Sequence, residues 1–174
     1  MPVRVRIRVD ADLGPCVRLL EAVHREDGYP THWPSDPARW LSPRETLGAW
    51  VAHGGGVVAG HIVLRATTAD GGADVWSAAT GLPPEQIAAT TRFFVARESR
   101  GAGVGGALLD AACAEAAARD LIPALDVVET NRDAIRLYEH RGWQRVHDEV
   151  WDDAPDGETM LYYYVAPRAM CAVE

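Results

Sequence analysis

The segment from Thr91 to Leu109 constrains the fold more than any other part of the chain. It comprises a short apolar strand, an arginine–glycine turn and the first turns of an amphipathic helix. Glycine lets the backbone approach a ligand where a Cβ atom would collide, and the first N–H groups of a helix have no acceptor inside the helix. These amides and the helix dipole attract an anion. The segment therefore predicts a phosphate or pyrophosphate site at four glycines: Gly101, Gly103, Gly105 and Gly106.

A dinucleotide-binding turn is an alternative interpretation of the same glycines. Gly101, Gly103 and Gly106 satisfy the spacing G-x-G-x-x-G, and Asp126 follows about 20 residues later, as that fingerprint requires. In the dinucleotide fold, however, the turn follows its strand immediately, whereas residues 96–100 separate strand and glycines here. Too little chain remains after the turn for the other strands of that fold. A dinucleotide-dependent oxidoreductase is therefore the less favoured alternative.

Composition limits the number of domains, the catalytic mechanisms and the partners that are possible. The 174 residues, 48% of them hydrophobic, are enough for one core, and we expect a single domain over residues 1–174. All 17 basic residues are arginine, which excludes a lysine Schiff base and a Walker-type phosphate loop. A net charge of -8 argues against a nucleic-acid partner and favours a cationic small molecule.

Two kinds of segment are missing from the sequence, namely a membrane span and a run with metal-ligand spacing. No run approaches the roughly 18 apolar residues of a membrane span, so we expect no membrane partner and a cytoplasmic location. The histidines lack metal-ligand spacing, and we treat them as surface or packing residues. We expect no metal site and reduced thiols, because the three cysteines are widely scattered: Cys16, Cys113 and Cys171.

Hydrophobic periodicity and turn residues predict the elements. Aliphatic residues alternate with arginines from Val3 to Val9, which is typical of a strand with one buried face. A helix is expected to about His24, and then an aromatic loop from Asp27 to Pro43 with a short helix after Ser35. Gly54–Gly56 between two apolar runs predicts a β-hairpin. The other expected elements are strands at 89–95, 124–128, 144–150 and 159–165, a helix from residue 104 that ends before residue 123, and a helix at 131–140.

Three segments of the second half of the chain are informative when they are taken together. Phe93-Phe-Val95 leads into Arg100-Gly-Ala-Gly-Val-Gly105, Glu129-Thr-Asn131 leads into Ala134-Ile-Arg-Leu-Tyr138, and the third segment is Arg141-Gly-Trp143. Together they resemble the GNAT superfamily of acetyl-CoA-dependent N-acetyltransferases. The first segment matches the family's Arg/Gln-x-x-Gly-x-Gly/Ala motif in its strand–turn–helix setting, and the third is similar to the family's usual Gly-Phe. The resemblance is sharp over residues 89–146.

The resemblance implies an α/β (α+β) fold, with a mixed, mostly antiparallel central sheet, a splayed parallel strand pair and flanking helices. It implies acetyl-CoA as co-substrate, with the pyrophosphate on the glycine turn and the pantetheine arm along the strand at 93–95. The cofactor-binding residues that it implies are Phe93, Phe94, Val95, Arg100, Gly101, Ala102, Gly103, Val104, Gly105, Gly106 and Asn131.

The resemblance also assigns catalytic roles. Tyr138 matches the position that protonates the departing thiolate in many relatives, and a thiol of ordinary pKa about 8.5 needs only modest help to leave. A backbone N–H, at Val95, would stabilise the oxyanion. The strand before the turn carries no carboxylate, unlike that of several relatives, so the base is open between Asp126, Glu85, Glu129 and a water chain. We rank Asp126 first, because a carboxylate within an apolar strand must be paired, hydrated or catalytic.

The predicted activity is transfer of an acetyl group from acetyl-CoA to the primary amine of a small molecule by direct attack. The aromatic loop at 27–43 either covers the core or lines the acceptor pocket. A non-catalytic acyl-CoA-binding or regulatory module is an alternative, in which the phosphate site is kept without a working base. Many relatives are dimers, which leaves a homodimer open.

Overall fold

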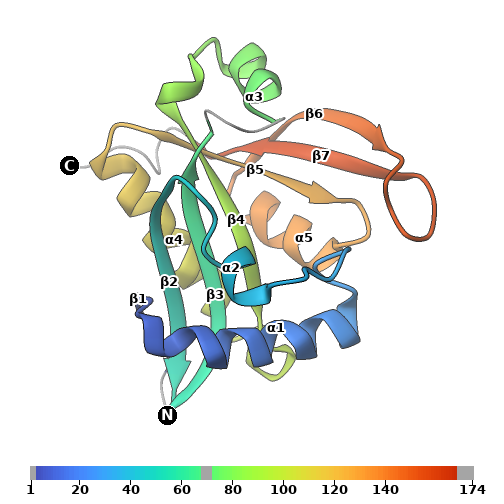
Figure 1. Ribbon diagram of the computed structural model, residues 1–174. Helices are drawn as coiled ribbons and strands as arrows, with labels where there is room; N and C mark the ends of the chain where they lie inside the picture. The colour runs from blue at the N-terminus through green and yellow to red at the C-terminus, as the bar shows by residue number, and fades with distance from the viewer. Residues whose placement is uncertain (1–2, 68–71, 168–174) are drawn as a thin grey trace. The chain divides into compact units, whose positions relative to one another are not determined.

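The computed structural model describes residues 3–67 and 72–167 and contains one mixed sheet of seven strands (Figure 1). The strand order is β1-β2-β3-β4-β5-β7-β6. The β4–β5 pair is parallel, and the other pairs for which the register is described are antiparallel. With its flanking helices, this arrangement confirms the expected fold class. The strands are β1 (Arg4–Ile7), β2 (Thr46–Gly54), β3 (Val57–Ala66), β4 (Ile87–Val95), β5 (Ile122–Val128), β6 (Gln144–Trp151) and β7 (Thr159–Val165).

The chain forms two compact units, one from residues 1–65 and 91–112 and the other from residues 66–90 and 113–174. Strand β4 and helix α4 (Val104–Ala118) each contribute several residues to both units, and β3 contributes its last residue, Ala66, to the second. The parallel ladder joins Ile87–Ala89 of β4 to Ile122–Ala124 of β5, and β4 continues beyond it to Val95. The glycine turn, residues 101–106, belongs to the first unit.

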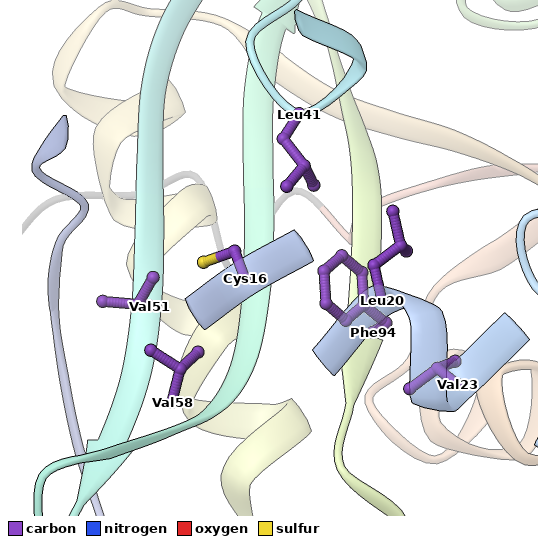
Figure 2. Packing of buried hydrophobic residues seen from close by; sticks show 7 residues of the cluster. All are labelled: Cys16, Leu20, Val23, Leu41, Val51, Val58 and Phe94. Carbon is purple, nitrogen blue, oxygen red and sulfur yellow. The ribbon is translucent and has the colours of Figure 1, made fainter. Parts of the chain in front are cut away.

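In the first unit, helix α1 (Leu13–Asp27) packs on the strands through one apolar stripe. Cys16, Leu20 and Val23 lie on this stripe and are buried, because a spacing of three and four residues repeats with the helical turn. Figure 2 shows them with their partners from the strands and from the end of helix α2 (Pro37–Trp40), namely Leu41, Val51, Val58 and Phe94. The expected short helix after Ser35 is thus confirmed.

The first strand is confirmed, but the prediction of a buried aliphatic face is wrong. Ile7 is 69% exposed and Val9 52% exposed. The arginines of the opposite face are the residues with partners, since Arg6 binds the buried carboxylate of Asp12 and Arg8 reaches the buried His61. A guanidinium with five donors can satisfy such buried acceptors from the surface, and Arg6 does so although it is itself exposed, as Ile7 is.

In the second unit, alternate residues of β7 face different helices. Tyr163 packs edge-on against Trp76 of helix α3 (Ala73–Thr80), with ring centroids 5.8 Å apart. Tyr164, the next residue, packs against Tyr138 of helix α5 (Arg132–His140), with centroids 6.0 Å apart. Side chains of a strand alternate between its faces, so β7 carries one aromatic layer on each side.

Three short 3-10 turns complete the description: Asp10–Asp12, Pro84–Gln86 and Arg97–Ser99. Within the described ranges, no helix has the length and apolar character needed to cross a membrane.

Candidate functional site

The predicted phosphate site is an exposed turn that leads into the N-terminus of α4. Gly101 and Gly103 have φ angles of 76° and 80°, in the left-handed region that favours glycine. A Cβ atom added at either position would have no neighbour within 4 Å, so the space beside both residues is open. The helical hydrogen bonds begin with Ala107 N–H to the Gly103 carbonyl, at 3.0 Å. The residues present therefore fit an anion, because open space adjoins the first amides of a fifteen-residue helix.

Arg100, at the head of this turn, is held by the chain itself. Its Nε and Nη2 each lie 3.2 Å from the carbonyl oxygen of Val95, and Nη2 also binds the carboxylate of Asp27 at the end of α1. These contacts tie the turn to the end of β4 and to α1. The structure thus gives the guanidinium a role in shaping the turn, alongside its expected contribution near a pyrophosphate.

The strand before the turn contains one residue with left-handed backbone, Arg92, which has a φ of 52° in the middle of β4. This position is called the kink of β4. Such a backbone is uncommon for a residue with a long side chain. The guanidinium of Arg92 lies over the ring of Trp40, 4.1 Å from its centroid, and its Nε donates to the Trp40 carbonyl at 3.1 Å. The kinked residue is therefore fixed to the end of α2.

His61 of β3 lies behind this kink and is fully buried. Its Nδ1 is 2.8 Å from the carbonyl oxygen of Arg92, and its Nε2 is 2.8 Å from Nη1 of Arg8. Burial lowers the pKa of His61 to about 4, so the ring is neutral at neutral pH. Because a carbonyl only accepts and a guanidinium only donates, Nδ1 carries the hydrogen and Nε2 the lone pair.

From the sequence, His61 was expected to be a surface or packing residue, and Arg92 had no predicted role. A signal was present, since His61 is a polar residue inside the apolar run of β3 and a buried histidine needs partners for both nitrogens. The partners are Arg8, which follows β1 directly, and Arg92 of β4, far apart in the sequence, and no spacing rule identifies them.

The three predicted pantetheine-binding residues of β4 differ in burial. Phe94 is 4% exposed, belongs to the core beneath α1 and stacks on the ring of His61 with centroids 5.3 Å apart. Phe93 and Val95 are partly exposed. Any role of Phe94 toward a ligand is thus limited to its main chain.

Of the residues predicted in the second unit, Tyr138 is the most buried, with 5% exposed. Its ring lies in an aromatic cluster with Trp143 and Tyr164, at centroid distances of 5.9 and 6.0 Å. The hydroxyl of Tyr164 donates to Glu139 at 2.9 Å, and burial together with this bond raises its pKa to about 12. Asn131 lies at the N-cap of α5, on which Tyr138 is carried.

The structure separates the candidate bases by their surroundings. Asp126 in β5 is exposed, and its backbone lies opposite Tyr163 of β7. Glu129 accepts from the N–H of Met160 at 3.1 Å and thereby ties the end of β5 to the start of β7. Glu85 is exposed in the turn Pro84–Gln86.

Comparison with known proteins supports the same fold. Residues 16–143 match the family model described as the acetyltransferase (GNAT) family. No curated protein matches the chain in sequence.

Solved structures resemble the whole chain. The ribosomal-protein-S18-alanine N-acetyltransferase of Escherichia coli has 17% sequence identity and a TM-score of 0.70, with 95% of this chain and 94% of that chain covered. NAA60 of Arabidopsis thaliana, in complex with a bisubstrate analogue, has 17% identity and a TM-score of 0.73, with 94% and 97% covered. The structure of yncA from Salmonella typhimurium, with its cofactor acetyl-CoA, has 17% identity and a TM-score of 0.70, with 94% and 92% covered. At such identities the similarity is one of fold.

Proposed function

Since the chain belongs to the GNAT family of acetyltransferases, and is therefore an enzyme that uses acetyl-CoA, we propose that it acetylates the primary amine of a small molecule by direct attack. The observation that carries the donor side is the turn at Gly101 and Gly103. Its open left-handed glycines precede α4 as a pyrophosphate site requires.

The donor would be held by main-chain groups. Amides of residues 101–106 would bind the pyrophosphate, and β4 beyond its short ladder with β5 would pair with the pantetheine arm. Asn131 would contact the pantetheine arm or the strand that precedes it. Main-chain binding explains why no lysine is needed for the phosphates in a chain whose cations are all arginine.

In the reaction, the amine nitrogen forms a bond to the thioester carbonyl carbon, and the carbon–sulfur bond breaks. One proton leaves the ammonium before attack, and a second leaves the nitrogen as the amide forms. We assign Asp126 as the group that takes up a proton, directly or through water, because it is an exposed carboxylate within the otherwise apolar strand β5. Tyr138 returns a proton to the leaving thiolate, and the N–H of Val95 stabilises the oxyanion.

A cationic small molecule is the proposed acceptor. The net charge of -8 attracts an ammonium group and repels acidic surfaces such as nucleic acid. Other proteins of this fold are described as acting on a protein, as the Escherichia coli enzyme is on ribosomal protein S18. Protein N-termini therefore belong in the test panel as the competing acceptor class.

The test measures binding and turnover separately. Calorimetric titration should show binding of acetyl-CoA and none of NAD, and a response to NAD alone would refute the family-based donor. Thiol release from acetyl-CoA is then followed with a panel of small amines, amino acids and peptides. Release with a small amine supports the proposal. Release with peptides only assigns a protein acceptor, and binding without release from any amine indicates a non-catalytic acyl-CoA-binding module.

A further inference from the structure

We propose that His61 is a positioning residue for acetyl transfer, which holds the carbonyl of Arg92 and thereby fixes the kink of β4 ahead of the residues that bind the donor. The inference rests on the proposed function, because that function gives the main chain of residues 93–95 its role. Its physical basis is a contact that the structure describes directly, the 2.8 Å separation between Nδ1 of His61 and the Arg92 oxygen.

The left-handed conformation at Arg92 requires stabilising contacts. Left-handed backbone costs a residue other than glycine roughly 1–2 kcal/mol, and such a conformation persists only where its surroundings stabilise it. At Arg92, the side chain is fixed by Trp40 and the carbonyl by His61. The first contact anchors the guanidinium, which can move about its long stem, whereas the second acts on the backbone itself.

The imidazole is suited to this task because it is itself held on its other side. Nη1 of Arg8 donates to Nε2 of His61 and also to the carbonyl of Leu41, at 2.8 and 2.5 Å, and Nη2 of Arg8 donates to the hydroxyl of Ser42 at 2.7 Å. The ring also stacks on Phe94. His61 therefore cannot rotate without breaking one of these contacts, and its neutral Nδ1–H form is the only tautomer that satisfies both neighbours.

Fixing the carbonyl of Arg92 also fixes the N–H of Phe93, because both belong to one peptide group. The peptide bond is planar and trans, so the N–H of Phe93 points opposite to the Arg92 carbonyl. Because that carbonyl is directed to His61, the N–H of Phe93 is directed to the other side of β4. A hydrogen bond from a neutral ring thus sets the direction in which the donor-binding stretch begins.

Two variants of similar size separate this role from simple packing. In His61→Asn, the side-chain amide can donate from near the Nδ1 position, whereas in His61→Gln the amide lies near the Nε2 position. Both variants lose ring stacking and are expected to lose similar stability. The readouts are Kd for acetyl-CoA, kcat and KM for transfer, melting temperature, and amide hydrogen exchange of residues 93–95 without any ligand.

We expect His61→Asn to keep kcat/KM within about threefold of the wild type, and His61→Gln to lose about tenfold or more with faster exchange at 93–95, since small misplacements cost up to about a hundredfold. Equal losses in the two variants, or none in His61→Gln, would overturn the proposal.

A measurement on the wild type covers the case in which neither variant folds. Nitrogen-15 NMR of the His61 ring should show a neutral imidazole with the hydrogen on Nδ1, and a hydrogen on Nε2 would refute the contact. A wild-type protein that neither binds acetyl-CoA nor releases thiol contradicts the proposed function instead, while exchange and NMR still report on the hold of His61.

Discussion

Asp12 accepts two hydrogen bonds from the guanidinium of Arg6, one on each carboxylate oxygen and both of 2.7 Å. This contact, with a further one from the N–H of Val9, lowers the pKa of Asp12 below its usual range. An aspartate whose pKa is lowered by folding stabilises the folded state above its unfolded pKa of about 3.9. The stabilisation is lost as the pH falls through the folded value.

We therefore expect Asp12→Asn to lower the melting temperature by a few degrees at neutral pH. The difference from the wild type should shrink below about pH 4, where the carboxylate of the unfolded chain takes up its proton, and should vanish below the lowered pKa of the folded state. Thermal unfolding followed by circular dichroism across pH 2–7 measures both. Asp133→Asn is the control, because Asp133 pairs with Arg136 on the exposed face of α5 and exposed pairs contribute little. A pH-independent difference would disprove the assignment.

Gly103→Glu should abolish acetyl-CoA binding, with a loss of affinity of at least a hundredfold, because bulk and negative charge would enter the pyrophosphate position. Gly56→Glu in the β2–β3 hairpin is a matched control. Gly56 has a φ of 82°, close to the 80° of Gly103, and both positions have open space beside them. Both variants thus carry the same backbone cost, and calorimetry should show a binding loss only in Gly103→Glu. Equal binding in the two would remove the turn from the donor site.

Tyr138→Phe should lower kcat about 10- to 100-fold, up to the lower end of the usual range for a general acid because a thiolate leaves readily, and leave acetyl-CoA affinity nearly unchanged. Tyr164→Phe is the control from the same cluster. It removes the 2.9 Å bond to Glu139, at a cost of about 1 kcal/mol in stability, without a change in kcat. Stopped-flow thiol release and thermal melts give the two quantities. An unaltered kcat in Tyr138→Phe would exclude this phenol from the chemistry.

Asp126→Asn should reduce kcat/KM by about tenfold to a hundredfold and remove the fall in rate at low pH, because the amide cannot take up a proton. The pH profile of kcat/KM is the measurement. Glu85→Gln distinguishes the exposed rival. If Glu85→Gln removes the low-pH limb while Asp126→Asn retains it, the base is Glu85. If both retain it, the proton leaves through water.

Gly60→Ala should destabilise the protein by about 1–3 kcal/mol, the usual cost of overpacking. A Cβ at Gly60 would lie 2.8 Å from Cδ1 of Leu108 in α4 and 3.1 Å from the carbonyl oxygen of Phe94. The leucine can move, but the carbonyl belongs to β4. Gly14→Ala in α1 is the control, since its nearest neighbour would be an arginine side chain at 3.6 Å. Urea unfolding should separate the two, and a neutral Gly60→Ala would show that β3 can shift away.

Much of the fold could be predicted from the sequence because local signals agree with tertiary ones. The apolar stripe on α1 predicts a helix, and the triple glycine before Val57 predicts a hairpin. The structure has both elements at these positions. The β4 strand and the turn after it were predicted from the same kind of signal.

The exposure of β1 and the contacts of its arginines could not be predicted, because alternation of arginine with Ile7 and Val9 fixes the period of a strand but not what lies against either face. Those contacts are made with His61 and Asp12, which the sequence alone does not place beside Arg8 and Arg6. The candidate site likewise contains one part that the sequence predicts and one part that it does not. Its glycine turn has a local signature, whereas the contact of His61 with β4 exists only once strands distant in sequence lie together.

An enzyme that handles an activated thioester exposes its own nucleophiles to that thioester. The cations that brace β4 and its turn are guanidinium groups, those of Arg8, Arg92 and Arg100. A guanidinium remains protonated throughout the pH range of a folded protein and offers no neutral nitrogen for acylation. A lysine in any of these positions would be a competing acceptor, so this all-arginine scaffold is chemically inert toward the reagent that it serves.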